Sequence, residues 1–299
     1  MVLLFVKTSI TTRTKYIINM SKQIHWFPGH MKKALNNIND SIKLVDVVIE
    51  LFDARCPASS INAQLEESIK NKKKLIILTK PDLADPSITK LWVERLKKEN
   101  DLVVDLDLTK GSATNEIIKL VSILGKSVWD KQIAKGMKPQ PLKTMIIGIP
   151  NVGKSSLINR LSKRKAAGVQ NKPGFTKGEQ WIKVSDQFLL LDTPGVLPMN
   201  FEDKKQSVNL ALIGSIREDI LPTTDLVIEL IKYLKTAYPN SLKERFDIDE
   251  IDDYESVINK ICLNRKLVKG NGELDIMRAE NLLLHEFKNG LLGRISLEK

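Results

Sequence analysis

The residues most clearly arranged for chemistry run from Gly148 to Ser155, with the sequence GIPNVGKS. Their spacing fits G-x-x-x-x-G-K-[ST], and the segment follows a short apolar run and precedes a run of helical periodicity. Glycines in such a loop let backbone N–H groups surround phosphates, and the start of the helix adds positive potential. The pattern predicts a phosphate site in which Lys154 neutralises β- and γ-phosphate oxygens and Ser155 binds Mg²⁺; a chance glycine-rich turn is the alternative. The predicted phosphate-binding residues of this segment are Asn151, Val152, Gly153, Lys154, Ser155 and Ser156.

A second segment downstream, from Asp192 to Gly195, has the sequence DTPG and closes another apolar run. Asp192 can hold Mg²⁺ through a water, and the amide of Gly195 can meet a γ-phosphate. Between the two segments Thr176, in the sequence PGFT, is the natural second hydroxyl ligand of Mg²⁺. We expect it to be ordered only when the γ-phosphate is present; an ordinary loop threonine is the alternative.

A third segment, Thr79-Lys80-Pro81-Asp82, follows the apolar run 75–78. A carboxylate at Asp82 can accept the N1–H and the 2-amino group of guanine, a pair that adenine does not offer. Lys80 would lay its aliphatic stem along the base, and Thr79 belongs to the same guanine-binding motif. A surface turn is the alternative. By position, the loop that backs the base is 107–111, with Leu108 and Thr109 facing the base.

The elements that must position these segments follow from the hydrophobic pattern. Buried strands are predicted at 45–52, 75–78, 102–104 and 144–147, separated by helical patterns such as 87–98 and 114–124, with a hairpin of 179–184 and 187–191 that turns near Ser185. Alternating strands and helices predict an α/β fold, a mostly parallel sheet with helices on both faces and ligands beyond the carboxyl ends of the strands. After about residue 200 helical periods continue without strands. We therefore expect a nucleotide-binding domain over 20–200 and a small all-helical domain over 201–299.

Length and composition agree with two globular domains and exclude some classes. The 299 residues are 42% hydrophobic, which is too apolar for disorder, and no apolar run is long enough to span a membrane. Two cysteines, Cys56 and Cys262, are too few for a disulfide framework or a zinc site, so a reducing compartment, the cytoplasm, is expected. Residues 1–19 are basic and free of acids, and are predicted to be either a non-native start before Met20 or a transit peptide to the mitochondrial matrix.

The order of the motifs is rotated, because the guanine motif precedes the phosphate motif. This order, with the segments WFPGHM (26–31), DAR (53–55), GIPNVGKS, PGFT and DTPG, resembles the circularly permuted GTPases of the YlqF/RbgA family over about residues 22–299. The resemblance implies a permuted P-loop GTPase domain followed by a helical domain, and hydrolysis of GTP to GDP and phosphate. Permutation moves the chain ends to surface loops and leaves the sheet unchanged. Thr79 stands where the family usually has Asn, which puts in doubt a hydrogen bond that braces the base loop.

The residue that orients the attacking water does not follow Gly195, because Val196 and Leu197 stand there and neither can do so. The resemblance implies that the catalytic residue is His30, whose neutral imidazole can accept a hydrogen bond from water. A capping or surface histidine is the alternative. The resemblance also suggests that the side-chain carbonyl of Asn151 helps to coordinate K⁺ against the phosphates.

The charge points to a polyanionic partner. Residues 128–183 carry twelve basic side chains against Asp130 and Glu179, a surplus of 10 in a chain of net charge +11, whereas 241–299 carry ten basic and twelve acidic residues. No motif for sequence-specific DNA binding is visible, which favours folded RNA. The resemblance implies precursors of the large ribosomal subunit and their rRNA as partners of a chain that is monomeric in isolation. The alternatives are a regulatory GTPase with a protein effector and a solvated basic face; a P-loop kinase is disfavoured by Asp192 and Asp82.

Overall fold

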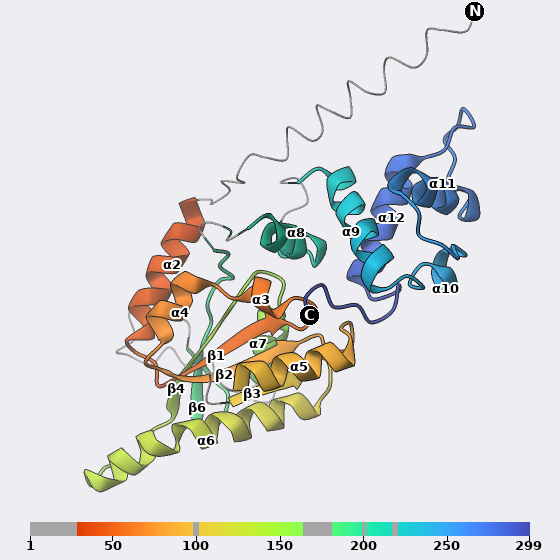
Figure 1. Cartoon of the computed structure of the whole chain (residues 1–299). Helices are drawn as coiled ribbons and strands as arrows, with labels where there is room; N and C mark the ends of the chain where they lie inside the picture. Colours follow the sequence, from red (N-terminus) through yellow and green to blue (C-terminus); the bar gives the residue numbers. More distant parts are fainter. Residues whose placement is uncertain (1–28, 98–101, 164–180, 199–200, 202, 217–220) are drawn as a thin grey trace, which may run out of the picture.

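The computed structural model describes residues 29–97, 102–163, 181–198, 201, 203–216 and 221–299. Figure 1 shows a sheet domain and, beside it, a group of helices formed by the later part of the chain. The strands are β1 (Val47–Asp53), β2 (Lys73–Thr79), β3 (Leu102–Leu106), β4 (Leu142–Gly148), β5 (Trp181–Lys183) and β6 (Phe188–Leu191). The helices are α2 (Gly29–Ile42), α3 (Pro57–Ser60), α4 (Ala63–Ile69), α5 (Pro86–Lys97), α6 (Ser112–Ala134), α7 (Lys154–Lys163), α8 (Lys204–Leu212), α9 (Thr223–Ala237), α10 (Lys243–Phe246), α11 (Tyr254–Asn264) and α12 (Ile276–Lys288).

The described strands form one six-stranded sheet in the order β3-β2-β1-β4-β6-β5. All neighbours are parallel except β5, which pairs antiparallel with β6. β1 is buried along its whole length, as expected for a central strand covered on both faces. The predicted mostly parallel α/β sheet and the hairpin near Ser185, whose hydroxyl accepts from the amides of Gln187 and Phe188, are therefore confirmed.

Side chains of β1 alternate between two cores, which places helices on both faces of the sheet. Ile49 and Leu51 belong to the core shared with α6 and α7, whereas Val48 belongs to the core shared with α2 and α4. Phe52 packs with α5 in a third cluster on the same face as Val48. Helices on both faces leave the carboxyl ends of the strands as the edge where a ligand can bind.

Helix α6 is longer than its predicted core, 114–124, and projects beyond the sheet (Figure 1). The extension carries Trp129, which packs against the main core and donates from Nε1 to the carbonyl of Gln140, at 2.9 Å. This contact lets the chain turn back into β4. The prediction stopped at Leu124 because side chains beyond the sheet edge have no second layer to maintain a strong apolar stripe.

The helices after residue 203 pack around α9, whose apolar stripe includes Leu226, Leu230 and Leu234. In the described residues beyond β6, the β pairing is a single bridge between Val268 and Leu274. The last residues, 290–299, leave this group and return to the sheet domain, where the amide of Leu297 donates to the carbonyl of Arg55 at 2.7 Å. The C-terminus consequently lies beside α3 (Figure 1). None of the helices in the described part of the chain combines the length and apolarity needed to cross a bilayer.

Candidate nucleotide-binding site

The predicted phosphate loop lies between the end of β4 and the start of α7. Gly148 is the last residue of β4 and Lys154 is the first of α7, so the strand, loop and helix follow one another as predicted. Gly148 has a φ of 153°, and a Cβ there would lie 2.8 Å from the carbonyl oxygen of Leu51. Asn151 adopts a left-handed φ of 58°. The loop therefore curves in a way that a glycine at its start makes possible.

Lys154 is the charged group at the centre of this loop. Its side chain is only 7% exposed, and Nζ donates to the carbonyls of Gly148 (3.0 Å) and Ile149 (2.7 Å). Burial lowers the pKa of Lys154 to about 8, and the negative charge of Asp192 opposes this shift. An anion placed in the loop would favour the charged form of Lys154.

The loop forms one wall of a cleft of about 740 Å³, and the DTPG segment forms the other. The hydroxyl of Thr193 donates to the carbonyl of Ile146 and fixes this segment to β4. A Cβ at Gly195 would lie 2.8 Å from Nζ of Lys154 and 2.9 Å from Pro150, so only glycine allows the two walls to approach this closely. The residues that line the cleft are Pro150, Asn151, Gly153, Lys154, Ser155, Ser156, Asp192, Thr193, Pro194 and Gly195.

The donor set of the cleft fits Mg²⁺. Ser155 and Asp192 are both exposed and line the same cleft, and hydroxyl, carboxylate and water oxygens are the ligands that Mg²⁺ prefers. Val152 contributes differently from its neighbours, because its side chain is buried in the core and only its backbone is left to meet a phosphate. Asn151 donates from Nδ2 to the carbonyl of Gly214, at 2.7 Å, which ties the loop to the residues after α8.

The guanine motif lies at the end of β2, beside the phosphate loop. Thr79 is fully buried, and its Oγ1 lies 2.7 Å from the carbonyl oxygen of Val152 and 3.1 Å from that of Phe52. The hydroxyl therefore makes a brace between the two loops. Lys80 has a φ of 54°, and its Nζ donates to the carbonyl of Asn151 (2.8 Å). Asp82 is exposed on the same loop.

Of the two residues predicted to face the base, one is buried. Leu108 is 7% exposed and packs in the main core, where a Cβ on Gly153 would lie 3.2 Å from its Cδ1. Thr109 is exposed, and its amide and hydroxyl donate to Oδ1 of Asp107 at 2.8 and 2.6 Å. These bonds lower the pKa of Asp107. Leu108 thus packs under Gly153 of the phosphate loop from the core side, and Thr109 stabilises the turn 107–109.

His30 is the second residue of α2, which begins at Gly29. Thr176, and the segment 26–28 of the motif WFPGHM, lie outside the described residues. The predicted site residues that the structure brings together are therefore those of the phosphate loop, the DTPG segment and the guanine motif.

Sequence reasoning assigned no role to a buried ionic cluster that supports the guanine motif. Asp53, at the end of β1, is fully buried and accepts from Nε and Nη2 of Arg55, both at 2.9 Å, and from Nζ of Lys80 at 2.9 Å. Burial alone would raise the pKa of Asp53, but the charges of Arg55 and Lys80 hold it well below its usual range. The signal in the sequence was an acid at the end of a mostly apolar strand with a base two residues later.

Comparisons with known proteins agree with this geometry. Residues 143–265 match a family model described as 50S ribosome-binding GTPase. The chain is 40% identical over 276 residues to ribosome biogenesis GTPase A of Bacillus cereus, covering 92% of this chain and 93% of the relative. It is 32% identical over 274 residues to the protein of the same name from Thermotoga maritima, covering 92% and 94%. Among solved structures, GNP-bound YlqF from T. maritima superposes with a TM-score of 0.65 at 26% identity, covering 89% of this chain and 98% of that one.

Proposed function

The chain belongs to the ribosome biogenesis GTPase A family and is a GTP-binding GTPase, and on this premise we propose that its GTP cycle controls binding to a precursor of the large ribosomal subunit. The observation that carries the proposal is the union of two half-sites. Lys154 is buried in a phosphate cleft, and the brace from Thr79 joins that cleft to the loop that carries Asp82. A cleft for phosphates next to a carboxylate that reads guanine is the minimum that a GTPase requires.

We propose that the phosphates occupy the cleft with Mg²⁺ held by Ser155, by Thr176 and, through water, by Asp192. Backbone N–H groups from Asn151 to Ser156, and that of Gly195, would meet phosphate oxygens. The ion would neutralise charge that develops on the transferred phosphoryl group. A potassium ligand role for Asn151 would use Oδ1, since Nδ2 of the same amide is bonded to Gly214. The guanine base would lie against Lys80 and Thr109, with its N1–H and 2-amino group on Asp82.

We assign the orientation of the attacking water to His30, at the start of α2. Such a group acts mainly on the transition state, so His30→Ala should keep GTP affinity and lower turnover by about 10²- to 10⁴-fold. Turnover is measured in the presence of ribosomal subunits and affinity by equilibrium titration with a GTP analogue. The control is His285→Ala, in the last turn of α12. Normal turnover of the His30 variant would show that the catalytic group lies elsewhere.

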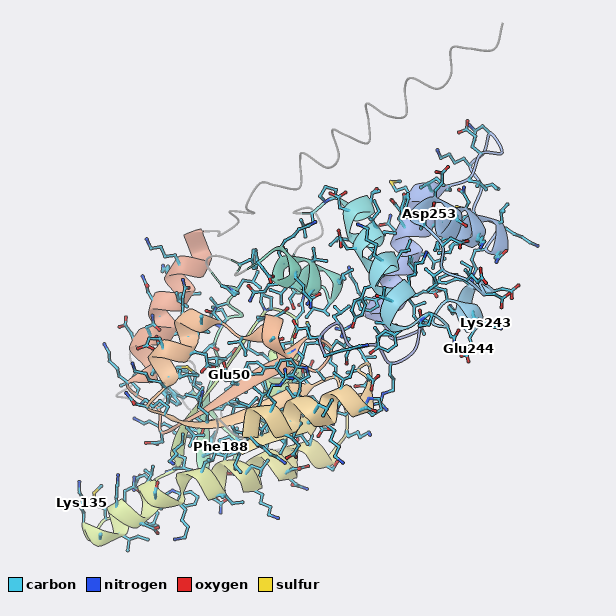
Figure 2. The ribbon with its side chains drawn as sticks, in the orientation of Figure 1. Glu50, Lys135, Phe188, Lys243, Glu244 and Asp253 are labelled. Atoms are coloured by element: carbon cyan, nitrogen blue, oxygen red, sulfur yellow. The ribbon has the colours of Figure 1, made fainter. Side chains whose placement is uncertain are left out.

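The partner surface we propose is basic. Exposed Lys131, Lys135 and Lys138 lie at the projecting end of α6, and Figure 2 shows Lys135 far from the sheet. The helices after residue 241 have no such surplus, so they would recognise shape or local patches. A backbone-dominated contact with folded rRNA fits this distribution, and a protein effector is the rival. Such a role places a monomeric protein where ribosomes are assembled, in the cytoplasm, or in the mitochondrial matrix if residues 1–19 are a transit peptide.

Co-sedimentation with large ribosomal subunits tests this function. We expect the protein to pellet with subunits in the presence of a non-hydrolysable GTP analogue and to remain in the supernatant with GDP. If about six to ten cations contact phosphates, binding should weaken by orders of magnitude between 50 and 200 mM salt, a range in which counterion release is strong. A flat salt profile, with capture of a protein in place of subunits, would favour the effector reading.

A further inference from the structure

The loop that carries Asp82 is bonded to the end of the chain. The carbonyls of Pro81 and Ala84 accept from Arg294, through Nη2 at 2.6 Å and Nε at 2.8 Å. These two carbonyls stand on either side of Asp82, so one guanidinium spans the base of the loop. A planar fork of donors suits this task, because it fixes the distance between the two acceptors.

The residues after Arg294 continue this contact along the loop. The amide of Ile295 donates to the carbonyl of Leu83 at 3.1 Å, and the amide of Asp85 donates to Oγ of Ser296 at 3.1 Å. Gly290 packs so closely that a Cβ there would lie 2.7 Å from Cδ2 of Leu83. The loop 81–85 is therefore bonded to residues 294–296 through three of its carbonyls and one amide.

The segment 294–298 is itself fixed at its far end. Glu298 is buried, and its carboxylate accepts from the amides of Ala58 (2.7 Å) and Ser59 (3.0 Å) and from Nδ2 of Asn209 (3.1 Å). On the other side, the hydroxyl of Tyr233 donates to the carbonyl of Ser296 at 2.5 Å. The segment thus connects the guanine loop to α3, α8 and α9, and a displacement of those helices would be transmitted to the loop.

We propose that Arg294 is a positioning residue for guanine recognition, and that it sets the specificity of the site by fixing the loop on which Asp82 stands. The inference rests on the proposed role of Asp82 as the group that reads the base. Reading two donors with one carboxylate requires a fixed orientation, and Asp82 is exposed at the top of a turn. Loss of Arg294 frees both flanking carbonyls, so the orientation of Asp82 is lost although Arg294 bonds only to the backbone of the loop.

The first test compares binding of GDP and of IDP, which lacks the 2-amino group, by equilibrium titration. We expect Arg294→Ala to weaken GDP binding by about tenfold, the effect of one charge-assisted hydrogen bond, and to bring GDP and IDP affinities together. Arg294→Lys keeps the charge but not the planar fork of donors. Its GDP affinity and its preference for GDP over IDP should lie between those of the wild type and of Arg294→Ala. Arg278→Ala, an exposed arginine of α12, is the matched control and should behave as the wild type.

The preference for GDP over IDP is the readout that a merely structural role would leave unchanged. A folded Arg294→Ala protein with the wild-type preference would overturn the proposal. If wild type itself shows no preference, or Asp82→Asn leaves it intact, the proposed guanine site fails instead, so the two failures are distinct. Should Arg294→Ala not fold, Ser296→Ala removes the acceptor of the Asp85 amide and should reduce the same preference by a few fold.

A second test needs no substitution, because coupling between two sites is reciprocal. Saturating GDP should slow hydrogen exchange of the Ile295 and Asp85 amides in the wild-type chain, measured by mass spectrometry of peptides that cover 81–86 and 293–298. Exchange in a peptide from the projecting end of α6 should not change. Equal exchange rates of the Ile295 and Asp85 amides with and without GDP would show that the segment 294–296 is independent of the base site.

Discussion

The phosphate loop lies in one continuous segment, Gly148 to Ser155, with the DTPG segment as the facing wall of its cleft, whereas the loop of the base half is held by residues from the far end of the chain. In the phosphate half, β4 and α7 position the loop, and Lys154 bonds to carbonyls of its own segment. In the base half, the loop after β2 is held by Asp53 through Lys80, and by Arg294, which is 210 or more positions away from the carbonyls it binds.

The difference shows which half depends on the rest of the molecule. A strand, a glycine-containing loop and a helix define most of the backbone path of the phosphate loop, and the bond from Asn151 to Gly214 adds a single tie to the residues after α8. The loop between β2 and α5 also has backbone bonds of its own, and in addition its carbonyls and the amide of Asp85 bond to residues 294–296. We therefore expect the phosphate half to determine hydrolysis and the base half to determine specificity.

The largest expected effect is the loss of turnover when Lys154, in the phosphate half, is replaced. Lys154→Ala should reduce GTP turnover by about 10³-fold, because a buried cation next to the transferred phosphate stabilises developing charge. The loss should be equal for GTP and ITP, since the phosphate half does not contact the base. Steady-state phosphate release measures both, and Lys90→Ala, at an exposed lysine of α5, is the control. Unchanged turnover would remove Lys154 from the mechanism.

A smaller, base-dependent effect is expected at Asp82. Asp82→Asn should shift the preference from GTP towards XTP by at least about 10²-fold, because the amide can donate to the C2 oxygen of xanthine but meets the 2-amino group of guanine as a second donor. Hydrolysis of bound XTP by the variant should then proceed near the wild-type GTP rate. An unaltered affinity for GTP would contradict the assignment of the guanine motif.

The ionisation of Lys154 gives the phosphate half a pH dependence of its own. In the nucleotide-free protein its pKa is about 8, whereas the unfolded chain keeps the proton up to about 10.5. The unfolded state therefore binds more protons between these values, and the free energy of unfolding should rise from pH 8 towards 10.5 by up to about 3 kcal/mol. Urea denaturation at pH 8 and 9.5, compared with Lys154→Met, measures it. Saturating GDP should abolish this difference between the wild type and the Met variant. A free energy of unfolding that falls with pH, relative to the Met variant, would contradict the prediction.

The smallest effect concerns Thr79, which joins the halves. Thr79→Val keeps the shape but removes the hydroxyl that meets the buried carbonyls of Val152 and Phe52, so it should destabilise the fold by about 1–3 kcal/mol. Thr79→Ser keeps the hydroxyl and is the matched control. Urea midpoints at constant slope compare the two variants. A Val variant as stable as the Ser variant would show that the brace carries no energy.

Much of this arrangement was predictable from the sequence because its signals are local. β-branched apolar runs placed the strands, and the GIPNVGKS spacing placed the phosphate loop between a strand and a helix. The extension of α6 to Ala134 was missed because beyond Gly125 the helix has no fully buried residue, and Ile133 is exposed. Leu108 was assigned to the base by position, and the structure buries its side chain beneath Gly153, a contact between segments that no spacing rule describes.

The phosphate loop was predictable from the chain alone, because glycines, a strand and a helix start encode that backbone path within one segment. So was the rotated order of the motifs, which is a property of the chain and not of its folding. That Thr79 bridges the two halves and that Arg294 holds the guanine loop became visible only in the folded molecule. Such contacts arise when distant segments pack side by side, and their partners are chosen by burial and by the need to satisfy buried carbonyls, not by distance along the chain.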